Sequence, residues 1–341
     1  MELIRPSFEI WEQKYDNPVE DMYKHIARCT RVCYQSEKKD NKETDEDFVK
    51  RVILRKEPWS SEANHLSVLE NGTVYLYLEV NPENAFKSFN YPSALFTAHY
   101  NWSDVVGHIA AKYRTNNYSK AITIITKDNK AVRRTYITTN FRVIIENNWL
   151  DDIQFICAPT VYHIKRITVS FITNIGVSRE FNRHRVDSIA EESTRYCNYN
   201  KRNDGQLKIG LPAWFLDEEH LPYLEGHTYD TVGDYAQGIL SQEDNEIVNT
   251  WCDMDFYLCS ITFSQWCYNM LIAKGWTAQM AREVLPLATK SQLIHTAFED
   301  DWKHFFKLRS EGVSGAPHPN AKLVADKLLK EFNIFLKNMQ Q

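Results

Sequence analysis

The feature that most limits what this chain can fold into is its mixture of two hydrophobic periodicities. Segments with helical spacing occur at 18–34, 44–55, 231–274, 277–286, 300–309 and 320–339. Segments rich in β-branched and aromatic residues predict strands at 73–80 and 166–175, and a hairpin over 121–139. A short helix, VSREFNRHR, is expected after the strand at 166–175. The pattern predicts an α+β fold, with helices around a small mixed or antiparallel sheet.

Composition excludes several classes of protein. The 341 residues are 43% hydrophobic and 25% charged, as in a soluble globular protein, and their net charge of −5 provides no global basic field for nucleic acid. Seven cysteines form no zinc pattern, and their odd number suggests reduced thiols. No apolar run reaches the length of about 18 residues that a membrane span needs. We therefore expect a cytoplasmic protein that binds no metal, no membrane and, stably, no nucleic acid.

One segment concentrates groups that bind anions. RHRVDSIAEESTRY (183–196) carries Arg183, Arg185 and Arg195 with His184 between the first two. Guanidinium groups are fixed planar donors suited to phosphate, and an irregular turn near Ser193 would add backbone N–H groups. The residue types alone leave two interpretations open: an anion site, or a salt-bridged loop after a helix C-terminus.

The order of these residues resembles a known motif. Arg-His-Arg, seven residues and then Ser is the signature of the flavin-dependent thymidylate synthases. Ala190 stands where that family commonly has Asn. The positions that match the wider family form are Arg183, His184, Arg185, Ser188, Glu191, Ser193, Arg195 and Tyr196.

Two other regions support the same resemblance. ARCTRVCY (27–34), followed by NHLSVLENGTVYLYLEV (64–80), is similar to the family's N-terminal helix and its GHxSxxEH segment, with matches at His65, Ser67 and Glu70. Residues 281–309 are similar to the family's ARxxLP…FxxLR stretch. The matches there are Arg282, Leu285, Pro286, His304, Phe305, Leu308 and Arg309.

The resemblance implies a function. Members of the family make dTMP from dUMP, with methylenetetrahydrofolate as carbon donor and with reducing equivalents from NADPH through FAD. It implies that Arg309 stabilises charge on the pyrimidine, assisted by Arg195. The implied nucleotide-binding residues are Glu180, Arg183, Glu191, Ser193, Thr194, Arg195, Arg282 and Arg309. The implied FAD-binding residues are His65, Ser67, Glu70, Arg183, His184, Arg185, Glu191 and His304. The resemblance also implies a homotetramer with sites at subunit interfaces.

The chain also departs from the family pattern. Residues 1–341 are expected to form one domain of this family, with insertions at about 81–165 and 198–250. Phe298 and Asp300 stand where the family often has an Asn-x-Arg flavin contact. These departures keep two alternatives open: a flavin-dependent paralogue that modifies another pyrimidine nucleotide, and a non-catalytic descendant that binds nucleotides or nucleic acid.

Overall fold

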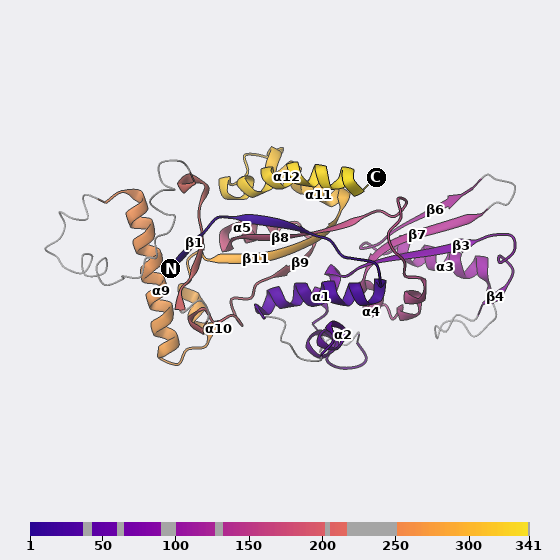
Figure 1. The fold of residues 1–341 in the computed structure, drawn as a ribbon, viewed down its shortest axis with the longest axis horizontal. Helices are drawn as coiled ribbons and strands as arrows, with labels where there is room; N and C mark the ends of the chain where they lie inside the picture. Colours follow the sequence, from indigo (N-terminus) through magenta and orange to yellow (C-terminus); the bar gives the residue numbers. More distant parts are fainter. Residues whose placement is uncertain are drawn as a thin grey trace.

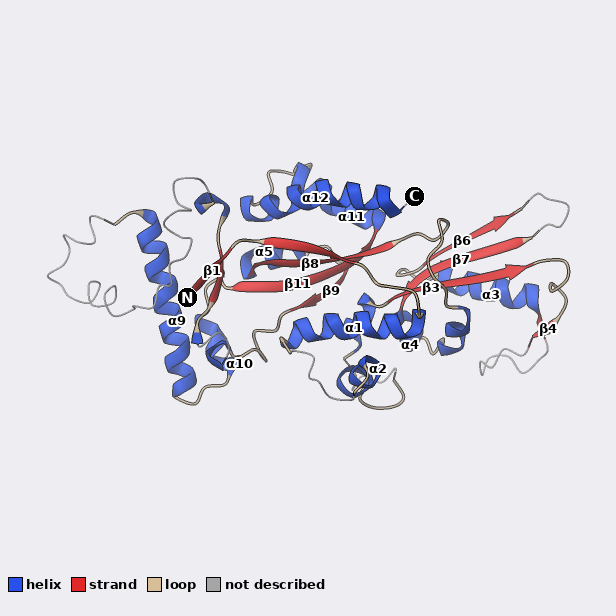
Figure 2. Ribbon diagram, in the orientation of Figure 1, coloured by secondary structure: helices blue, strands red, loops and turns tan. Residues whose placement is uncertain are grey.

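The computed structural model describes residues 1–36, 43–59, 65–89, 100–126, 132–201, 205–216 and 251–339. It is an elongated molecule with a sheet near its centre, helices on both faces of that sheet, and a second sheet toward one end (Figure 1). The predicted α+β class is confirmed. Figure 2 shows that the strands of the two sheets are separate groups along the long axis.

The central sheet has four antiparallel strands in the order β2-β8-β11-β9. Strands β8 and β11 pair along their whole length, from Lys290 opposite Asn174 to Phe298 opposite Arg166. The strand predicted at 166–175 is confirmed, whereas the sequence analysis did not predict β2, β9 or β11. The bounds are β2 Ser7–Trp11, β8 Arg166–Asn174, β9 Ser188–Glu191 and β11 Lys290–Phe298.

The two faces of this sheet bury different side chains. Because successive strand residues point to opposite faces, Ile167, Val169 and Phe171 all face one side. There they pack in one apolar core with residues of helices α5 (Ile175–Phe181), α11 (Glu299–Phe306) and α12 (Pro319–Met339). The predicted C-terminal helices at 300–309 and 320–339 are thus confirmed.

The other face is polar and lies against helix α1 (Pro18–Tyr34), which matches the helix predicted at 18–34. Nε2 of His25, on α1, is hydrogen-bonded to the hydroxyl of Thr168 at 3.1 Å. Thr168 and Thr296 are joined at 2.8 Å, and Thr296 donates to the side-chain oxygen of Asn71 at 2.9 Å. Burial lowers the pKa of His25 from 6.5 to about 3, so its imidazole is neutral.

This histidine makes stability depend on pH. Below pH 6.5 the unfolded chain binds a proton at His25 that the folded chain does not, so stability is lost as the pH falls from 6.5 toward 3. At pH 5 His25 alone should cost about 2 kcal/mol. The free energy of unfolding, measured in urea at pH 7 and pH 5, should differ less between the two pH values in His25→Gln than in the unchanged chain. An equal difference in both proteins would contradict this assignment.

Two of the three strands of the second sheet, β6 and β7, lie in the segment predicted to be an insertion, 81–165, and the third, β3, precedes it. The strands of this sheet are antiparallel in the order β3-β7-β6, and β6 and β7 are the predicted hairpin, whose connecting residues 127–130 lie outside the described residues. The strand predicted at 73–80 is β3. That 81–165 is an insertion stays a prediction. The bounds are β3 Thr73–Val80, β6 Lys120–Ile125, β7 Arg133–Asn140, α3 Trp102–Arg114 and α4 Phe141–Glu146.

At the opposite end, β1 (Glu2–Ile4) pairs in parallel with β10 (Lys208–Gly210). Helix α9 (Asp253–Ala273) ends just before Gly275, whose φ of +91° suits a glycine. Most of the second predicted insertion, 198–250, and the first part of the helix predicted at 231–274 lie outside the described residues. The remaining bounds are α2 Asp45–Val49, β4 Ser88–Phe89, β5 Tyr100–Asn101 and α10 Ala278–Ala281.

Three observations on the described ranges bear on the expected class of protein. No helix in them is both long enough and apolar enough to cross a membrane. No group of histidine, cysteine and carboxylate side chains in them could hold a metal ion. All seven cysteines lie in them as free thiols.

Candidate functional site

The Arg-His-Arg sequence lies on a tight turn and not on the helix predicted for it. Helix α5 ends at Phe181, and the backbone N–H of His184 donates to the carbonyl of Phe181 at 3.1 Å. The side chain of Asn182 donates to Glu191 of β9 at 2.8 Å, which holds the chain beside the sheet. The turn exposes Arg183 and Arg185 and buries His184.

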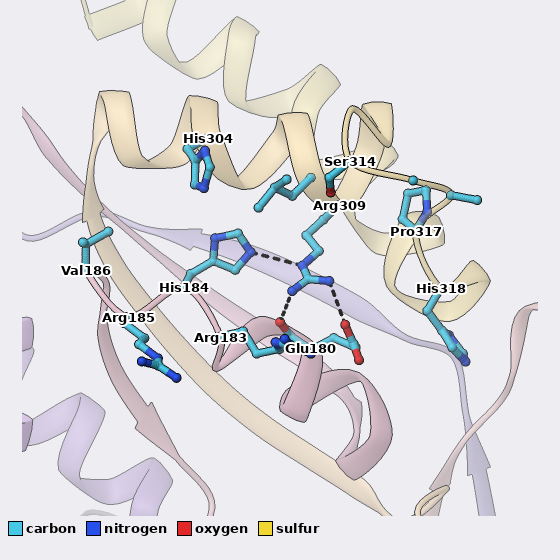
Figure 3. Close-up of a pocket in the computed structure, with 13 residues that line it drawn as sticks. Glu180, Arg183, His184, Arg185, Val186, His304, Arg309, Ser314, Pro317 and His318 are labelled. Atoms are coloured by element: carbon cyan, nitrogen blue, oxygen red, sulfur yellow. Dashed lines mark hydrogen bonds and ion pairs between the residues drawn. The ribbon is translucent and has the colours of Figure 1, made fainter.

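This turn forms one wall of a cavity of about 490 Å³ (Figure 3). The opposite wall comes from helix α11 and from the loop that follows Arg309. The lining residues that matter for binding are Glu180, Arg183, His184, Arg185, His304 and Arg309. The loop supplies residues 314–317, which are small or apolar, and His318. We call this space the turn cavity.

Arg309 is fixed at the centre of the turn cavity (Figure 3). Its Nε donates to Nε2 of His184 at 3.1 Å, its Nη1 donates to the carboxylate of Glu180 at 2.7 Å, and its Nη2 donates to the backbone carbonyl of Glu180. Burial, together with the smaller effect of the Arg309 charge, lowers the pKa of His184 from 6.5 to about 4. His184 is therefore neutral and can accept the hydrogen bond.

The donors of the turn cavity fit an anionic ligand. Arg183 and Arg185 are exposed, and neither forms an ion pair or hydrogen bond with any other residue that the structure describes. Three arginines and three histidines line the space against a single carboxylate, that of Glu180. Such an excess of donors favours a diphosphate, which carries several acceptor oxygens.

A second cavity, of about 640 Å³, lies on the other side of helix α5. Its polar lining comes mainly from Arg179 of α5, Glu191, Ser193, Thr194, Arg195 and Arg282. We call this space the loop cavity. It collects the predicted phosphate-binding residues, whereas Glu180, Arg183 and Arg309 of the predicted nucleotide set lie in the turn cavity.

The loop cavity presents side chains and few backbone donors. Ser193 N–H already donates to the carbonyl of Cys33 at 3.0 Å, and Arg195 N–H donates to the hydroxyl of Ser193 at 3.3 Å. Arg282 donates to the hydroxyl of Thr194 at 3.3 Å. The backbone anion site expected from the sequence is thus reduced to the N–H of Thr194, which has no partner in the described ranges.

The two glutamates of the loop both line the loop cavity but differ in their partners. Glu192 is buried and pairs with Lys290 at 2.6 Å, so its charge is compensated. Glu191 accepts from Asn182 at 2.8 Å and from Ser291 at 2.7 Å. Among the described residues only Glu192 is therefore compensated by a cation, so a phosphate in the loop cavity relies on Arg179, Arg195 and Arg282 to offset the charge of Glu191.

Three predicted flavin residues, His65, Ser67 and Glu70, line neither cavity. They lie on a 3-10 helix, Leu66–Asn71 with His65 before it, and the side chains of His65 and Ser67 are exposed. The carboxylate of Glu70 pairs with Arg142 of α4.

Two arginines in this region were missed by the sequence analysis. Arg142 belongs to the predicted insertion, where no motif marks it. Arg166 is buried at the start of β8 and donates to the carbonyl of Glu70 at 3.0 Å and to the hydroxyl of Ser188 at 2.6 Å. Arg166 therefore links the Glu70 segment to the strand that follows the turn.

Comparison with known proteins identifies one matching family. The family model described as thymidylate synthase complementing protein matches residues 109–335. A search of curated protein sequences gave no match.

Solved structures with a similar arrangement include two nucleotide-modifying enzymes. One is the UMP/dUMP methylase PolB from Streptomyces cacaoi bound with 5-Br dUMP, at 22% identity and a TM-score of 0.33, covering 49% of this chain and 66% of that chain. The other is thymidylate synthase X from Helicobacter pylori with FAD and dUMP, at 18% identity and a TM-score of 0.30, covering 48% of this chain and 66% of that chain. This chain thus spans just under two thirds of each, and likeness at this level carries no argument about activity.

Proposed function

The chain belongs to the thymidylate synthase complementing protein family, the flavin-dependent thymidylate synthases, and we propose on that basis that it converts dUMP to dTMP. In the proposed reaction methylenetetrahydrofolate donates the carbon, and NADPH provides the reducing equivalents through FAD. The observation that carries the proposal is the family match over residues 109–335, which includes both cavities.

The loop cavity supplies what a nucleotide monophosphate needs. The hydroxyls of Ser193 and Thr194 and the guanidinium groups of Arg195 and Arg282 can all donate to phosphate oxygens. Glu191 can accept a hydrogen bond from a sugar hydroxyl, because its carboxylate is bound only to neutral donors among its described partners. We assign the dUMP phosphate and sugar to this cavity.

Arg309 is the proposed catalytic residue. To become nucleophilic, C5 of uracil must gain electron density, and negative charge then builds on the pyrimidine carbonyls and N3. A fixed guanidinium at that edge stabilises this charge more in the transition state than in the ground state. The three hydrogen bonds that hold Arg309 prevent it from reorienting, so little reorganisation is needed during the reaction.

The turn cavity is the proposed flavin site. Arg183 and Arg185 would bind the diphosphate, and His184 and His304 would contact the rest of the cofactor. Bound FAD would supply the redox chemistry, while the chain contributes binding and orientation. We include His65, Ser67 and Glu70 as residues that contact the cofactor from outside the turn cavity.

Assembly would bring the two cavities' ligands together. Arg309 and the phosphate-binding residues line separate cavities on the two sides of α5. We propose that the chain forms a homotetramer in which the turn cavity of one subunit completes the loop cavity of another.

Flavin absorbance and isotope release test this function. The purified protein should bind FAD, with visible absorbance, and release tritium from [5-³H]dUMP when methylenetetrahydrofolate and NADPH are present. dCMP in place of dUMP should give no turnover. Protein that binds no FAD and releases no tritium would contradict the proposal. Turnover of dCMP but not of dUMP would instead favour a paralogue with a different pyrimidine substrate, which Phe298 and Asp300 would then help to explain.

A further inference from the structure

We propose that Asp187 and His295 form a positioning pair that ties the Arg183–Arg185 turn to the centre of the sheet. The pair lines neither the turn cavity nor the loop cavity. It acts on the site through the backbone of the turn and through His184. The proposal rests on the proposed function in one respect only, namely that the turn binds FAD.

The pair joins two segments that are far apart in the sequence. Nδ1 of His295 lies 3.0 Å from Oδ2 of Asp187, and the two side chains are 0% and 1% exposed. A carboxylate only accepts hydrogen bonds, so His295 donates through Nδ1. His295 lies in the middle of β11, opposite Ile189 of β9, which places the bond at a fixed point of the sheet.

The surroundings of the pair are apolar. Phe171, Phe181 and Phe305 lie with ring centroids 5.8, 6.3 and 6.4 Å from that of His295. Oδ1 of Asp187 and Nε2 of His295 have no hydrogen-bond partner among the described residues. A buried polar pair that is only half satisfied stabilises a fold no better than two apolar side chains of similar size. Stability alone therefore gives no reason for this pair.

What the pair does control is the path of the turn. The N–H of Asp187 donates to the carbonyl of His184 at 3.1 Å, so anchoring Asp187 also fixes His184. His184 in turn accepts from Arg309, as Figure 3 shows. Held this way, the turn buries His184 and Asp187 and directs Arg183 and Arg185 outward.

The effect on the site is one of geometry. The negative charge of Asp187 opposes the lowering of the His184 pKa, while Arg309, His295 and His304 add to it. Without the charge of Asp187 the His184 pKa would fall further below about 4, and the ring would stay neutral at pH 7. An uncharged side chain that still accepts from His295 should therefore preserve the function of Asp187.

Apolar replacement separates positioning from stabilisation. In the double variant D187L/H295F the midpoint of urea unfolding should stay equal or rise. Hydrogen–deuterium exchange of the amides in 182–188 should become about 10-fold faster or more, and the Kd for FAD should rise by about 10- to 100-fold. D187N should restore protection of the turn and FAD affinity to about the level of the unchanged chain.

Thr296→Val provides the matched control, because Thr296 is a buried polar residue next to His295 but faces α1. It should lower stability without changing exchange in 182–188. The inference is overturned if D187L/H295F leaves that exchange unchanged. It is also overturned if exchange rises across the whole chain in step with a loss of stability, since the pair is then only part of the core. Because exchange is measured without ligand, it decides the inference even if the unchanged chain binds no FAD and the proposed function fails.

Discussion

Replacing Arg309 with lysine should slow dTMP formation by about 100- to 1,000-fold, as does the loss of one donor aimed at developing charge in other enzymes. A lysine retains the positive charge but loses the planar fork that donates to His184 and Glu180 together. It would therefore not hold its charge at one place on the pyrimidine edge. Single-turnover kinetics of dUMP methylation, with enzyme in excess, measure this rate directly.

Arg51→Lys is a suitable control for Arg309→Lys. Arg51 is an exposed arginine that also pairs with a glutamate, Glu43, at 2.7 Å. Its replacement by lysine should leave the rate within about twofold, because exposed ion pairs contribute little. If Arg309→Lys turned over as fast as Arg51→Lys, the catalytic role of Arg309 would be wrong.

Replacing Arg282 with alanine should weaken dUMP binding by about 10- to 100-fold, which corresponds to the loss of one hydrogen bond between charged groups. Arg282 lines the loop cavity and already contacts Thr194, so its guanidinium is placed beside the proposed phosphate. Isothermal titration calorimetry with dUMP gives the Kd. The Kd for FAD should not change, because the turn cavity contains no part of Arg282.

Deoxyuridine, which has no phosphate, is the informative comparison ligand. Its affinity, weak as it will be, should be the same for Arg282→Ala and for the unchanged chain. If the variant lost affinity for deoxyuridine as strongly as for dUMP, Arg282 would act on the base or sugar and the phosphate assignment would fail.

The elements that the sequence predicted well are those whose local pattern agrees with their environment. Helix α1 begins at Pro18 and buries one apolar face, and β3 and β8 are rich in β-branched and aromatic residues. In each of these elements the apolar side chains that enter a core recur at a regular spacing, which can be recognised in the sequence. The hairpin of β6 and β7 belongs to the same group.

Strand β11 was missed because its polar side chains hide its period. Five of the nine residues of KSQLIHTAF are polar, and four of them contact side chains 100 or more residues away in the sequence. These contacts are Ser291 with Glu191, Gln292 with Ser170, His295 with Asp187 and Thr296 with Asn71. A local sequence pattern cannot predict a contact with a partner that lies 100 or more residues away. One of the two inner strands of the central sheet was thus missed for lack of a local signal.

For the site, the motif identified the candidate residues but not which of the two cavities each residue lines. Arg183 and Ser193 are ten residues apart, yet they line different cavities, because strand β9 (Ser188–Glu191) runs between them. The path of the turn also differs from the predicted helix. Asn182 is hydrogen-bonded to Glu191 and Asp187 to His295, and the local sequence cannot predict these contacts with the sheet.

Helix α5 has a role that follows from its position between the two cavities. Glu180, near its C-terminal end, faces the turn cavity, while Ser178 and Arg179 face the loop cavity. Any ligand that displaces this short helix from one side changes the shape available on the other. The two binding equilibria are then thermodynamically linked, and such linkage is reciprocal: whatever factor one ligand imposes on the affinity of the second, the second imposes on the first.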